Sequence, residues 1–460
     1  MAEVICPENE MEVIPPEVLL DKVMEKKEQG LRLSQACAAW VDGKYELSYS
    51  FANDETYQYQ TLRIVMEKDT EVSSITAFYP YAFLYENEMT ELFGVKIKSI
   101  HPDYQNKLYR IKAERRLCRE EATQLGQRLL MPNGRPHPVL TDPIQGDMVN
   151  EKEKIIEGIP SIGFIHRGLE SLVEKKDFNE MTYVVERTCG ICSFMHGMGY
   201  CESVEHIMHV EVPDRGKFLR TIWCEMSRMH SHLLWLGLLA DAFGFESLFY
   251  QCWRMREKIL DLFELTTGGR CIFSVNKIGG VLKDIDEEMM STILGVMDEM
   301  EQDMKAIIKT FLSDYTVESR LKGVGVLTKQ QAHDLGAAGP FARASGIAMD
   351  MRKRGYAAYP HIDFEPITSD IGDSYARCDV RIHEVLQSID IIRQAAAKMP
   401  KGEIGVNVKG NPNGEYFMRV AQPRGEAIYY VTAHGTTFLD RMRVRTPTFP
   451  NLPGMPATLR

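Results

Sequence analysis

Apolar residues recur at alternating spacings of three and four along three long segments of this 460-residue chain. They are Leu219, Ile222, Met226, Met229, Leu233, Leu236 and Ala240, then Ile293, Met297, Met300, Met304, Ile307 and Phe311, then Val385, Ile389, Ile392, Ala396 and Met399. This spacing places the apolar side chains on one face of a helix, and such a face is buried against a neighbouring element. The three segments therefore predict long helices that pack into a bundle. The many methionines on these faces are interpreted as core-filling side chains.

Alternation of apolar and polar residues marks strands at both ends of the chain. Near the N-terminus it covers 45–49 and 62–66, beside a helical pattern at 18–27, and together these predict a small domain of mixed structure. Near the C-terminus it covers 416–420 and 428–431, which predicts a small sheet flanking the bundle.

Prolines and a glycine at 131–138, after a charged stretch, break any helix and mark a domain boundary. We expect a small α/β N-terminal domain at 1–115, a linker at 116–136 and a mainly α, helical-bundle domain with a small flanking β-sheet at 137–460. The predicted fold class is α+β.

Charge and hydropathy exclude some classes of protein. A net charge of -11 argues against a nucleic-acid binder, because neutralising phosphates needs clustered Lys and Arg. No apolar run approaches the roughly 18 to 20 residues that span a bilayer, and the first residues lack the pattern of a secretory signal. We therefore expect a peripheral protein on the cytoplasmic side, with any membrane role exerted through partners.

Two cysteines, Cys189 and Cys192, form the one closely spaced pair among the ten in the sequence. At a helix start, two thiols at this spacing can chelate one metal ion, and Gly190 lets the backbone turn between them. His196 lies one turn beyond Cys192 and so falls on the same helical face. Arg187 is expected to favour the thiolate, which is the form that binds metals.

The spacing alone leaves three interpretations open: half of a zinc site, a thioredoxin-like redox pair, or two structural cysteines. A zinc site needs about two further ligands, and the other cysteines stand alone in the sequence. A thioredoxin-like pair opens a helix inside a βαβ unit, whereas this pair leads into the predicted bundle.

The segment 186–196, which includes Cys-Gly-Ile-Cys and the following histidine, resembles the first cysteine motif of nickel-iron hydrogenase large subunits. The chain beyond it is similar both to those hydrogenases and to the quinone-site subunit of complex I. Similar segments are 202–213, 249–269, 279–281, 339–346, 350–353, 372–377, 423–426 and 443–447. Upstream, 82–102 resembles a small accessory subunit of complex I, in the order found in large subunits of the formate hydrogenlyase type.

The resemblance implies an oxidoreductase subunit, the large subunit of a membrane-associated, energy-converting [NiFe] hydrogenase. In that family four thiolates from two Cys-x-x-Cys motifs hold nickel, and two of them bridge to iron. By position Cys189 and Cys192 match the first pair, and His196 is expected to act in catalysis beside them. Glu170 matches an acidic residue that helps to hold magnesium, and Arg167 is expected to act in catalysis. The alternative for Arg167 and Glu170 is an ordinary ion pair.

The loop 137–143 is similar to a family loop that approaches the active site. In relatives it supplies a proton-relay carboxylate or quinone-pocket residues. Asp142 is thus a candidate for proton transfer and His137 a candidate for contact with the cofactor or acceptor. The alternative for Asp142 is a helix cap or a turn.

The second Cys-x-x-Cys motif of the family is expected beyond 443–452, yet no cysteine follows Cys378. The nickel-iron centre is therefore incomplete in this chain, and these 460 residues alone are not expected to turn over hydrogen. Truncation, natural loss of nickel chemistry, or a tail on a separate polypeptide would each explain this. Two other functions stay open: a complex I-like subunit that passes electrons to a quinone or another acceptor, and an inactive scaffold for an iron-sulfur subunit.

Partners follow from the cysteine count and from the resemblance. The chain lacks the clustered cysteines of an iron-sulfur site, so we expect electrons to arrive through the iron-sulfur clusters of a small partner subunit. The resemblance also implies membrane antiporter-like subunits.

Overall fold

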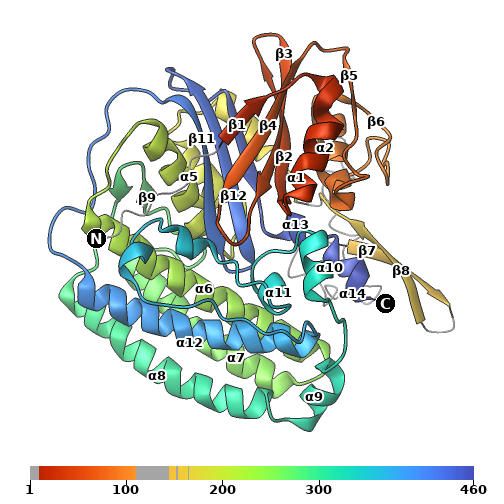
Figure 1. The fold of residues 1–460 in the computed structure, drawn as a ribbon. Coiled ribbons are helices and arrows are strands. Elements are labelled where there is room, and N and C mark those ends of the chain that lie inside the picture. Colours follow the sequence, from red (N-terminus) through yellow and green to blue (C-terminus); the bar gives the residue numbers. More distant parts are fainter. Residues whose placement is uncertain (1–9, 110–144, 152–153, 164, 460) are drawn as a thin grey trace, which may run out of the picture.

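The computed structural model describes residues 10–109, 145–151, 154–163 and 165–459, and it is a mixed α+β structure. The N-terminal part forms a four-stranded sheet in the order β1-β4-β3-β2 (Figure 1). Its strands are β1 (Glu10–Val13), β2 (Arg32–Val41), β3 (Lys44–Ala52) and β4 (Tyr59–Met66). Asp42 and Gly43 both have positive φ and form the two-residue turn between β2 and β3, as an Asp-Gly hairpin turn requires.

Two helices cover one face of this sheet, α1 (Leu19–Glu28) and α2 (Phe83–Phe93). Leu19 and Val23 of α1 and Met89 of α2 share one apolar core with the sheet. The predicted helix at 18–27 and the strands at 45–49 and 62–66 are confirmed. The structure adds short elements: η1 (Pro16–Val18), β5 (Glu71–Ser73), η2 (Pro80–Ala82), β6 (Lys96–Lys98), β7 (Gln145–Glu151) and β8 (Lys154–Ser161).

A buried carboxyl group in this domain titrates near neutrality. Glu86 on α2 is fully buried and accepts hydrogen bonds from Ser74 Oγ (2.5 Å) and from the Ile75 amide (2.9 Å). Burial raises the pKa of Glu86 from 4.5 to about 7, although these hydrogen bonds act in the opposite direction.

We expect the stability of the protein to fall as the pH rises from about 4.5 to about 7. Folded Glu86 holds its proton in that window while the unfolded chain releases it, so this one group contributes a slope of roughly 1.4 kcal/mol for each pH unit. Glu86→Gln should remove this contribution and raise the melting temperature at pH 8 but not at pH 4. Melting curves across this range measure it, and an equal shift at both pH values would contradict the assignment.

Four long helices form the bundle that fills the lower half of Figure 1. They are α6 (Asp214–Ala242), α7 (Glu246–Thr267), α8 (Glu287–Phe311) and α12 (Ser374–Lys398). The three predicted helices correspond to α6, α8 and α12, and their apolar positions are buried except Ala396 and Met399, which are half-buried at the end of α12. The fourth helix, α7, is not among the helices that the apolar spacing predicts.

Shorter elements connect the bundle to the rest of the chain. They are η3 (Leu169–Glu174), α4 (Met181–Glu186), α5 (Ser193–Ile207), β9 (Asn276–Lys277), β10 (Gly280–Val281), α9 (Tyr315–Leu321), α10 (Lys329–Asp334), α11 (Pro340–Arg343), η4 (Met351–Arg354), η5 (Tyr359–His361), α13 (Thr448–Asn451) and α14 (Gly454–Thr458). No helix in the described ranges combines the length and the apolar character needed to cross a bilayer.

The predicted C-terminal sheet is confirmed as an antiparallel sheet of β11 (Asn413–Gln422), β12 (Gly425–His434) and β13 (Arg441–Arg445). Gln422 pairs with Gly425, so Pro423 and Arg424 form the hairpin turn between β11 and β12. A Cβ at Gly339 would lie 2.2 Å from the Cα of Gly425, so glycine is needed where the two backbones meet. The turn is therefore pressed against the start of α11.

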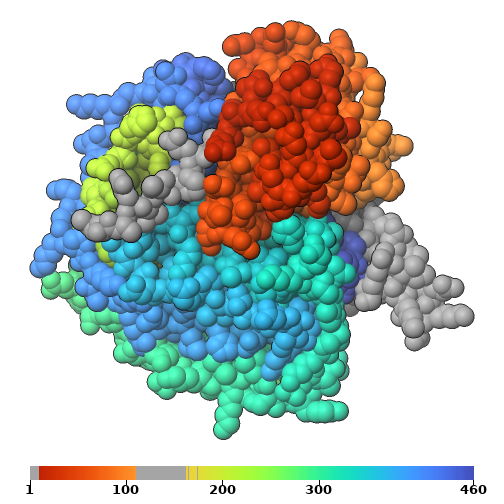
Figure 2. Space-filling view, in the orientation of Figure 1, coloured from red at the N-terminus to blue at the C-terminus, as the bar shows by residue number. Residues whose placement is uncertain are grey.

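The C-terminal sheet lies between the N-terminal domain and α5 (Figure 1). In Figure 2 its blue atoms lie directly beside the orange atoms of the N-terminal domain. Tyr59 of β4 packs with Phe417 and Tyr430 of the C-terminal sheet. Arg63 of β4 binds Glu415 of β11 through two hydrogen bonds of 3.0 and 2.8 Å. The two parts of the chain therefore share a packed interface.

A buried carboxylate, Glu426, lies at the centre of this interface. It accepts from Arg419 Nε (2.6 Å) and Arg445 Nη2 (2.6 Å) of its own sheet, and from Arg32 Nη2 (3.2 Å) of β2. Burial would raise the pKa of Glu426, but the three guanidiniums hold it well below its usual value. The carboxylate is therefore charged and shared by both domains.

Candidate metal site

The cysteine motif forms the turn between α4 and α5. The helix α5 begins at Ser193, directly after Cys192, and the His196 amide bonds to the Cys192 carbonyl at 3.2 Å. The sulfurs of Cys189 and Cys192 and one ring nitrogen of His196 all lie within 4.8 Å of one another. The predicted placement of Cys192 and His196 on one helical face is confirmed. Cys192 and His196 are buried and Cys189 is half-buried.

The surroundings of Cys189 favour its thiolate. The contact with the Cys192 thiol is the main reason that the pKa of Cys189 lies well below its usual value; burial opposes the shift, and His196 and Arg424 support it. The predicted role of Arg187 is corrected, because its Nη1 donates to the Tyr183 carbonyl (2.5 Å) and the cation beside the thiol is Arg424. A thiolate is the form that ligates metal ions.

Two side chains of the C-terminal hairpin complete the surroundings of the motif. Cys192 Sγ donates to Gln422 Oε1 (3.6 Å), and Gln422 Nε2 donates to the Tyr429 hydroxyl (3.0 Å). That hydroxyl lies 2.7 Å from His196 Nδ1. Because the Tyr429 oxygen already accepts from Gln422, its own hydrogen points at Nδ1, which leaves the ring proton on Nε2. Within the described part of the chain, this Nε2 is buried without a hydrogen-bond partner.

Gly199 brings the Tyr429 ring close to α5, since a Cβ at this position would lie 2.3 Å from Tyr429 Cε2. Gly199→Ala is therefore expected to displace the ring from His196 and to cost about 1–3 kcal/mol through overpacking. The matched control is Gly295→Ala on α8, where a Cβ meets nothing within 4 Å. The control should gain about 0.5–1 kcal/mol from helix propensity. Thermal unfolding of both variants measures this, and equal effects would contradict the packing argument.

His230 on α6 is a further polar group near the motif. It is 1% exposed, and its Nδ1 has no hydrogen-bond partner among the residues that the structure describes. Burial, assisted by the Arg256 charge, lowers the pKa of His230 to about 3, while Cys189 acts in the opposite direction. The ring is therefore neutral. Its sequence context, a histidine on a long helix, did not distinguish it from an ordinary core residue.

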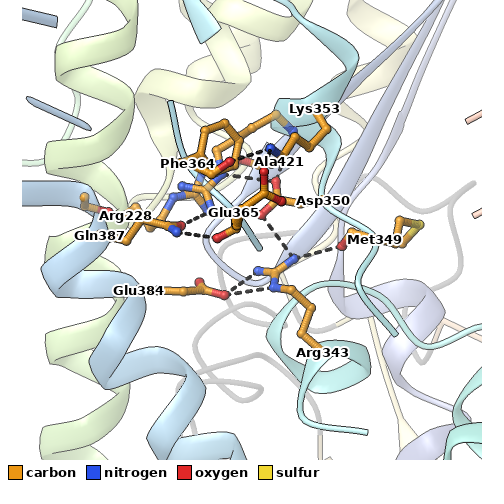
Figure 3. A network of polar contacts seen from close by, with 12 residues as sticks. Arg228, Arg343, Met349, Asp350, Lys353, Phe364, Glu365, Glu384, Gln387 and Ala421 are labelled. Atoms are coloured by element: carbon orange, nitrogen blue, oxygen red, sulfur yellow. Dashed lines mark hydrogen bonds and ion pairs between the residues drawn. The ribbon is translucent and has the colours of Figure 1, made fainter. Parts of the chain in front are cut away.

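A buried network of charged residues supports the hairpin turn from the bundle side (Figure 3). Arg228 of α6 donates to the carbonyls of Ala421 (2.9 Å) and Gln422 (3.4 Å). Its Nε also contacts Glu225 at 3.2 Å. The turn that carries Gln422 and Arg424 is thus fixed by an arginine that is itself ion-paired.

The network continues to α12 and η4. Arg343 binds Glu384 at 2.6 Å, and Arg352 binds Asp350 at 2.8 Å. Burial alone would raise the pKa values of Asp350 and Glu384, but the neighbouring arginines hold both below the usual range. Both carboxylates are therefore charged inside the protein core.

The other predicted site residues lie elsewhere. Glu170 accepts from Arg441 Nη1 (2.8 Å), Arg443 Nη1 (3.4 Å) and the Val444 amide (2.9 Å), and these arginines lower its pKa although burial would raise it. Arg167 donates to the Arg187 carbonyl at 2.5 Å. Arg167 and Glu170 therefore bind other partners and do not form the ion pair that was the alternative interpretation. The magnesium role of Glu170 stays a prediction.

The loop that carries His137 and Asp142 lies outside the described residues. Arg167 holds the backbone that enters the cysteine motif, because Arg187 directly follows α4 as its C-cap. The structure therefore brings together Cys189, Cys192 and His196 from the predicted set. It adds Gln422, Tyr429, Arg424 and His230, which come from distant parts of the sequence.

The donor set restricts the chemistry of this site. Two thiols and an imidazole are soft and borderline ligands, which suit nickel, zinc or iron rather than magnesium. The two thiols fit two of the four thiolate positions of a nickel-iron centre. The thioredoxin-like interpretation loses support, because the motif packs against the antiparallel β11 and β12 strands rather than within a βαβ unit.

Comparisons with known families cover almost the whole described chain. The family described as the 49 Kd subunit of respiratory-chain NADH dehydrogenase matches residues 242–411 and 407–460. The nickel-dependent hydrogenase family matches 167–241, which includes the cysteine motif. The 30 Kd subunit of respiratory-chain NADH dehydrogenase matches 14–114, in agreement with the predicted accessory domain.

Similar individual proteins include both hydrogenases and quinone oxidoreductases. The alpha subunit of the membrane-bound hydrogenase of Pyrococcus furiosus is 35% identical, over 70% of this chain and 80% of the relative. An NADH-quinone oxidoreductase subunit of Chloroherpeton thalassium is 31% identical, over 76% of this chain and 87% of the relative. Formate hydrogenlyase subunit 5 of Escherichia coli is 29% identical, over 91% of this chain and 79% of the relative.

Proposed function

The chain belongs to the family that includes the 49-kDa subunit of respiratory NADH dehydrogenase and the large subunits of nickel-dependent hydrogenases. From this premise we propose that it is the catalytic large subunit of an energy-converting [NiFe] hydrogenase. One observation carries the proposal. The sulfurs of Cys189 and Cys192 converge with His196 in a largely buried site, where the Cys189 thiolate is favoured.

Cys189 and Cys192 would hold nickel through their sulfurs. The bound centre would supply the chemistry that joins two protons and two electrons into hydrogen. The chain's own residues would prepare this site: burial excludes water, Arg424 supplies positive charge beside Cys189, and Tyr429 orients His196. A four-thiolate centre then needs two thiolates besides those of Cys189 and Cys192.

Partner subunits are part of this proposal. Electrons would come from an iron-sulfur small subunit, because the ten cysteines of this chain contain a single Cys-x-x-Cys spacing. Antiporter-like membrane subunits would hold the complex at the cytoplasmic face of the membrane. The relatives named as membrane-bound hydrogenase and NADH-quinone oxidoreductase subunits support a multisubunit assembly.

The second candidate is electron transfer to a quinone without nickel. The match of 242–460 to the 49 Kd family favours it, together with the relative from Chloroherpeton thalassium. In this case the thiols at 189 and 192 would be dispensable. His137 would then be a candidate for contact with the acceptor. In the hydrogenase case, Asp142 would be a candidate for proton transfer.

The test is nickel content and hydrogen evolution of the native complex, purified through a tag on this chain. The proposal expects stoichiometric nickel and hydrogen evolution in the parent, and loss of both in Cys189→Ser. The matched control is Cys271→Ser, an exposed cysteine whose replacement should change neither. A nickel-free parent complex that reduces quinone would overturn the proposal and support the second candidate.

A further inference from the structure

The contact between the cysteine motif and the C-terminal hairpin is a chain of three hydrogen bonds. It runs from Cys192 Sγ to Gln422 (3.6 Å), from Gln422 to Tyr429 (3.0 Å) and from Tyr429 to His196 (2.7 Å). Cys192 and His196 belong to one turn of chain, so the two hairpin residues close a ring of polar contacts around them. This ring is called the polar bridge.

The polar bridge is buried along its whole length. Gln422 is 1% exposed and Tyr429 and His196 are 0% exposed. Inside a protein each of these groups needs a partner, because an unpaired buried polar group costs about 1–3 kcal/mol. Each one therefore restrains its neighbour, and movement of one side chain leaves another unsatisfied.

The two hairpin residues are themselves held in place. Arg228 fixes the backbone of Gln422 through its carbonyl at 3.4 Å, and the absence of a side chain at Gly199 lets the Tyr429 ring lie against α5. Gln422 also ends β11, three residues before Gly425 begins β12. The polar bridge is thus built on rigid elements at both ends, as a preorganised ligand site requires.

We propose that Gln422 and Tyr429 are positioning residues, which tie the Cys192 sulfur to the His196 ring and so fix the donor atoms of the site before a metal binds. Gln422 sets the direction of the Cys192 sulfur, and Tyr429 sets the rotamer and the tautomer of His196. Insofar as these atoms hold nickel, the proposal rests on the proposed function.

The first test needs no metal. Nitrogen-15 NMR of the histidine rings in the full chain reports which ring nitrogen carries the proton, and His196→Gln identifies the signals. The parent should show His196 protonated at Nε2 with Nδ1 as an acceptor. In Tyr429→Phe this signature should change to a tautomer mixture. The control is Tyr200→Phe on α5, the helix that carries His196; it loses a bond to the Phe178 carbonyl and should keep the parent signature. An unchanged signature in Tyr429→Phe overturns the proposal.

The second test uses cobalt(II) as a spectroscopic probe of the full chain. The parent should show a thiolate-to-cobalt band that Cys189→Ser lacks. Cys192 binds cobalt as a thiolate, which only accepts hydrogen bonds, so the Gln422 amide then has to turn its Nε2 donor toward the sulfur. Gln422→Met keeps the side-chain shape without this donor and should weaken cobalt binding about 10-fold or more, as loss of a ligand's supporting contact does. The matched control is Gln35→Met, at a buried glutamine of the N-terminal domain that bonds Ser50.

The outcomes separate the two claims. Parent-like cobalt affinity in Gln422→Met overturns the positioning role of Gln422. A parent that gives no thiolate-to-cobalt band overturns the metal assignment under the proposed function, and the histidine spectra then decide alone whether the polar bridge positions His196.

Discussion

Glu225→Gln is expected to destabilise the protein by about 3–5 kcal/mol, because it leaves the buried Arg228 without its carboxylate and removes one of the two carboxylates of Arg352. Glu225 on α6 is fully buried and contacts Arg228 (3.2 Å) and Arg352 (3.3 Å). It also accepts from Ser388 (2.6 Å) and from Tyr359 (2.5 Å). Burial would raise the pKa of Glu225, but the two arginines hold it below the usual value, so the charged form is native.

Thermal and urea unfolding of the full chain measure this loss. The matched control is Glu299→Gln on α8, whose carboxylate is 66% exposed and pairs with Lys258 at 3.0 Å. Exposed pairs contribute about 0–1 kcal/mol, so the control should unfold almost like the parent. Similar midpoints for the two variants would show that Glu225 is not needed to balance the buried arginines.

The second large effect is expected from Glu426→Gln at the domain interface. The substitution removes one carboxylate charge shared by Arg32, Arg419 and Arg445, all at most 1% exposed. Arg32 keeps Asp54 as a partner at 3.0 Å, whereas the two arginines of the C-terminal sheet lose their carboxylate. We expect a loss of about 3–5 kcal/mol, concentrated at the interface.

Hydrogen exchange measured by mass spectrometry locates this effect. In Glu426→Gln, protection should fall in β2, β11 and β12 and stay at the parent level in α8. The comparison variant is Glu415→Gln, at a carboxylate of the same sheet that is 32% exposed and pairs with Arg63, and its effect should be smaller. Uniform loss of protection over the whole chain would contradict a role confined to the interface.

The helical bundle could be predicted because its signal is local. Apolar positions of α8 such as Met297, Met300 and Met304 repeat every three or four residues and are all buried. The helix α6 carries the same pattern, yet Glu225 and Arg228 are also buried on it. Periodicity assigns charged residues to the solvent face, so a network of internally paired charges has no sequence signature.

The candidate site could be predicted only in part, for a similar reason. Cys189, Cys192 and His196 lie within one short segment, and their spacing indicates that they converge. Gln422 and Tyr429 reach the same place from a hairpin more than 200 residues further along the chain, through strand register and a glycine contact. Contacts between such distant residues form only in the packed tertiary structure. Composition and residue spacing along the sequence do not predict them.

The shared carboxylate Glu426 has a consequence for synthesis on the ribosome. Arg32 is made 394 residues before Glu426, which at about 5–20 residues per second is an interval of about 20–80 s. The N-terminal domain is complete early in this interval. Asp54, only 22 residues beyond Arg32, is then the nearby carboxylate that neutralises Arg32. Docking of the two ends of the chain is therefore a late event, in which Glu426 joins an arginine that already has Asp54 as a partner.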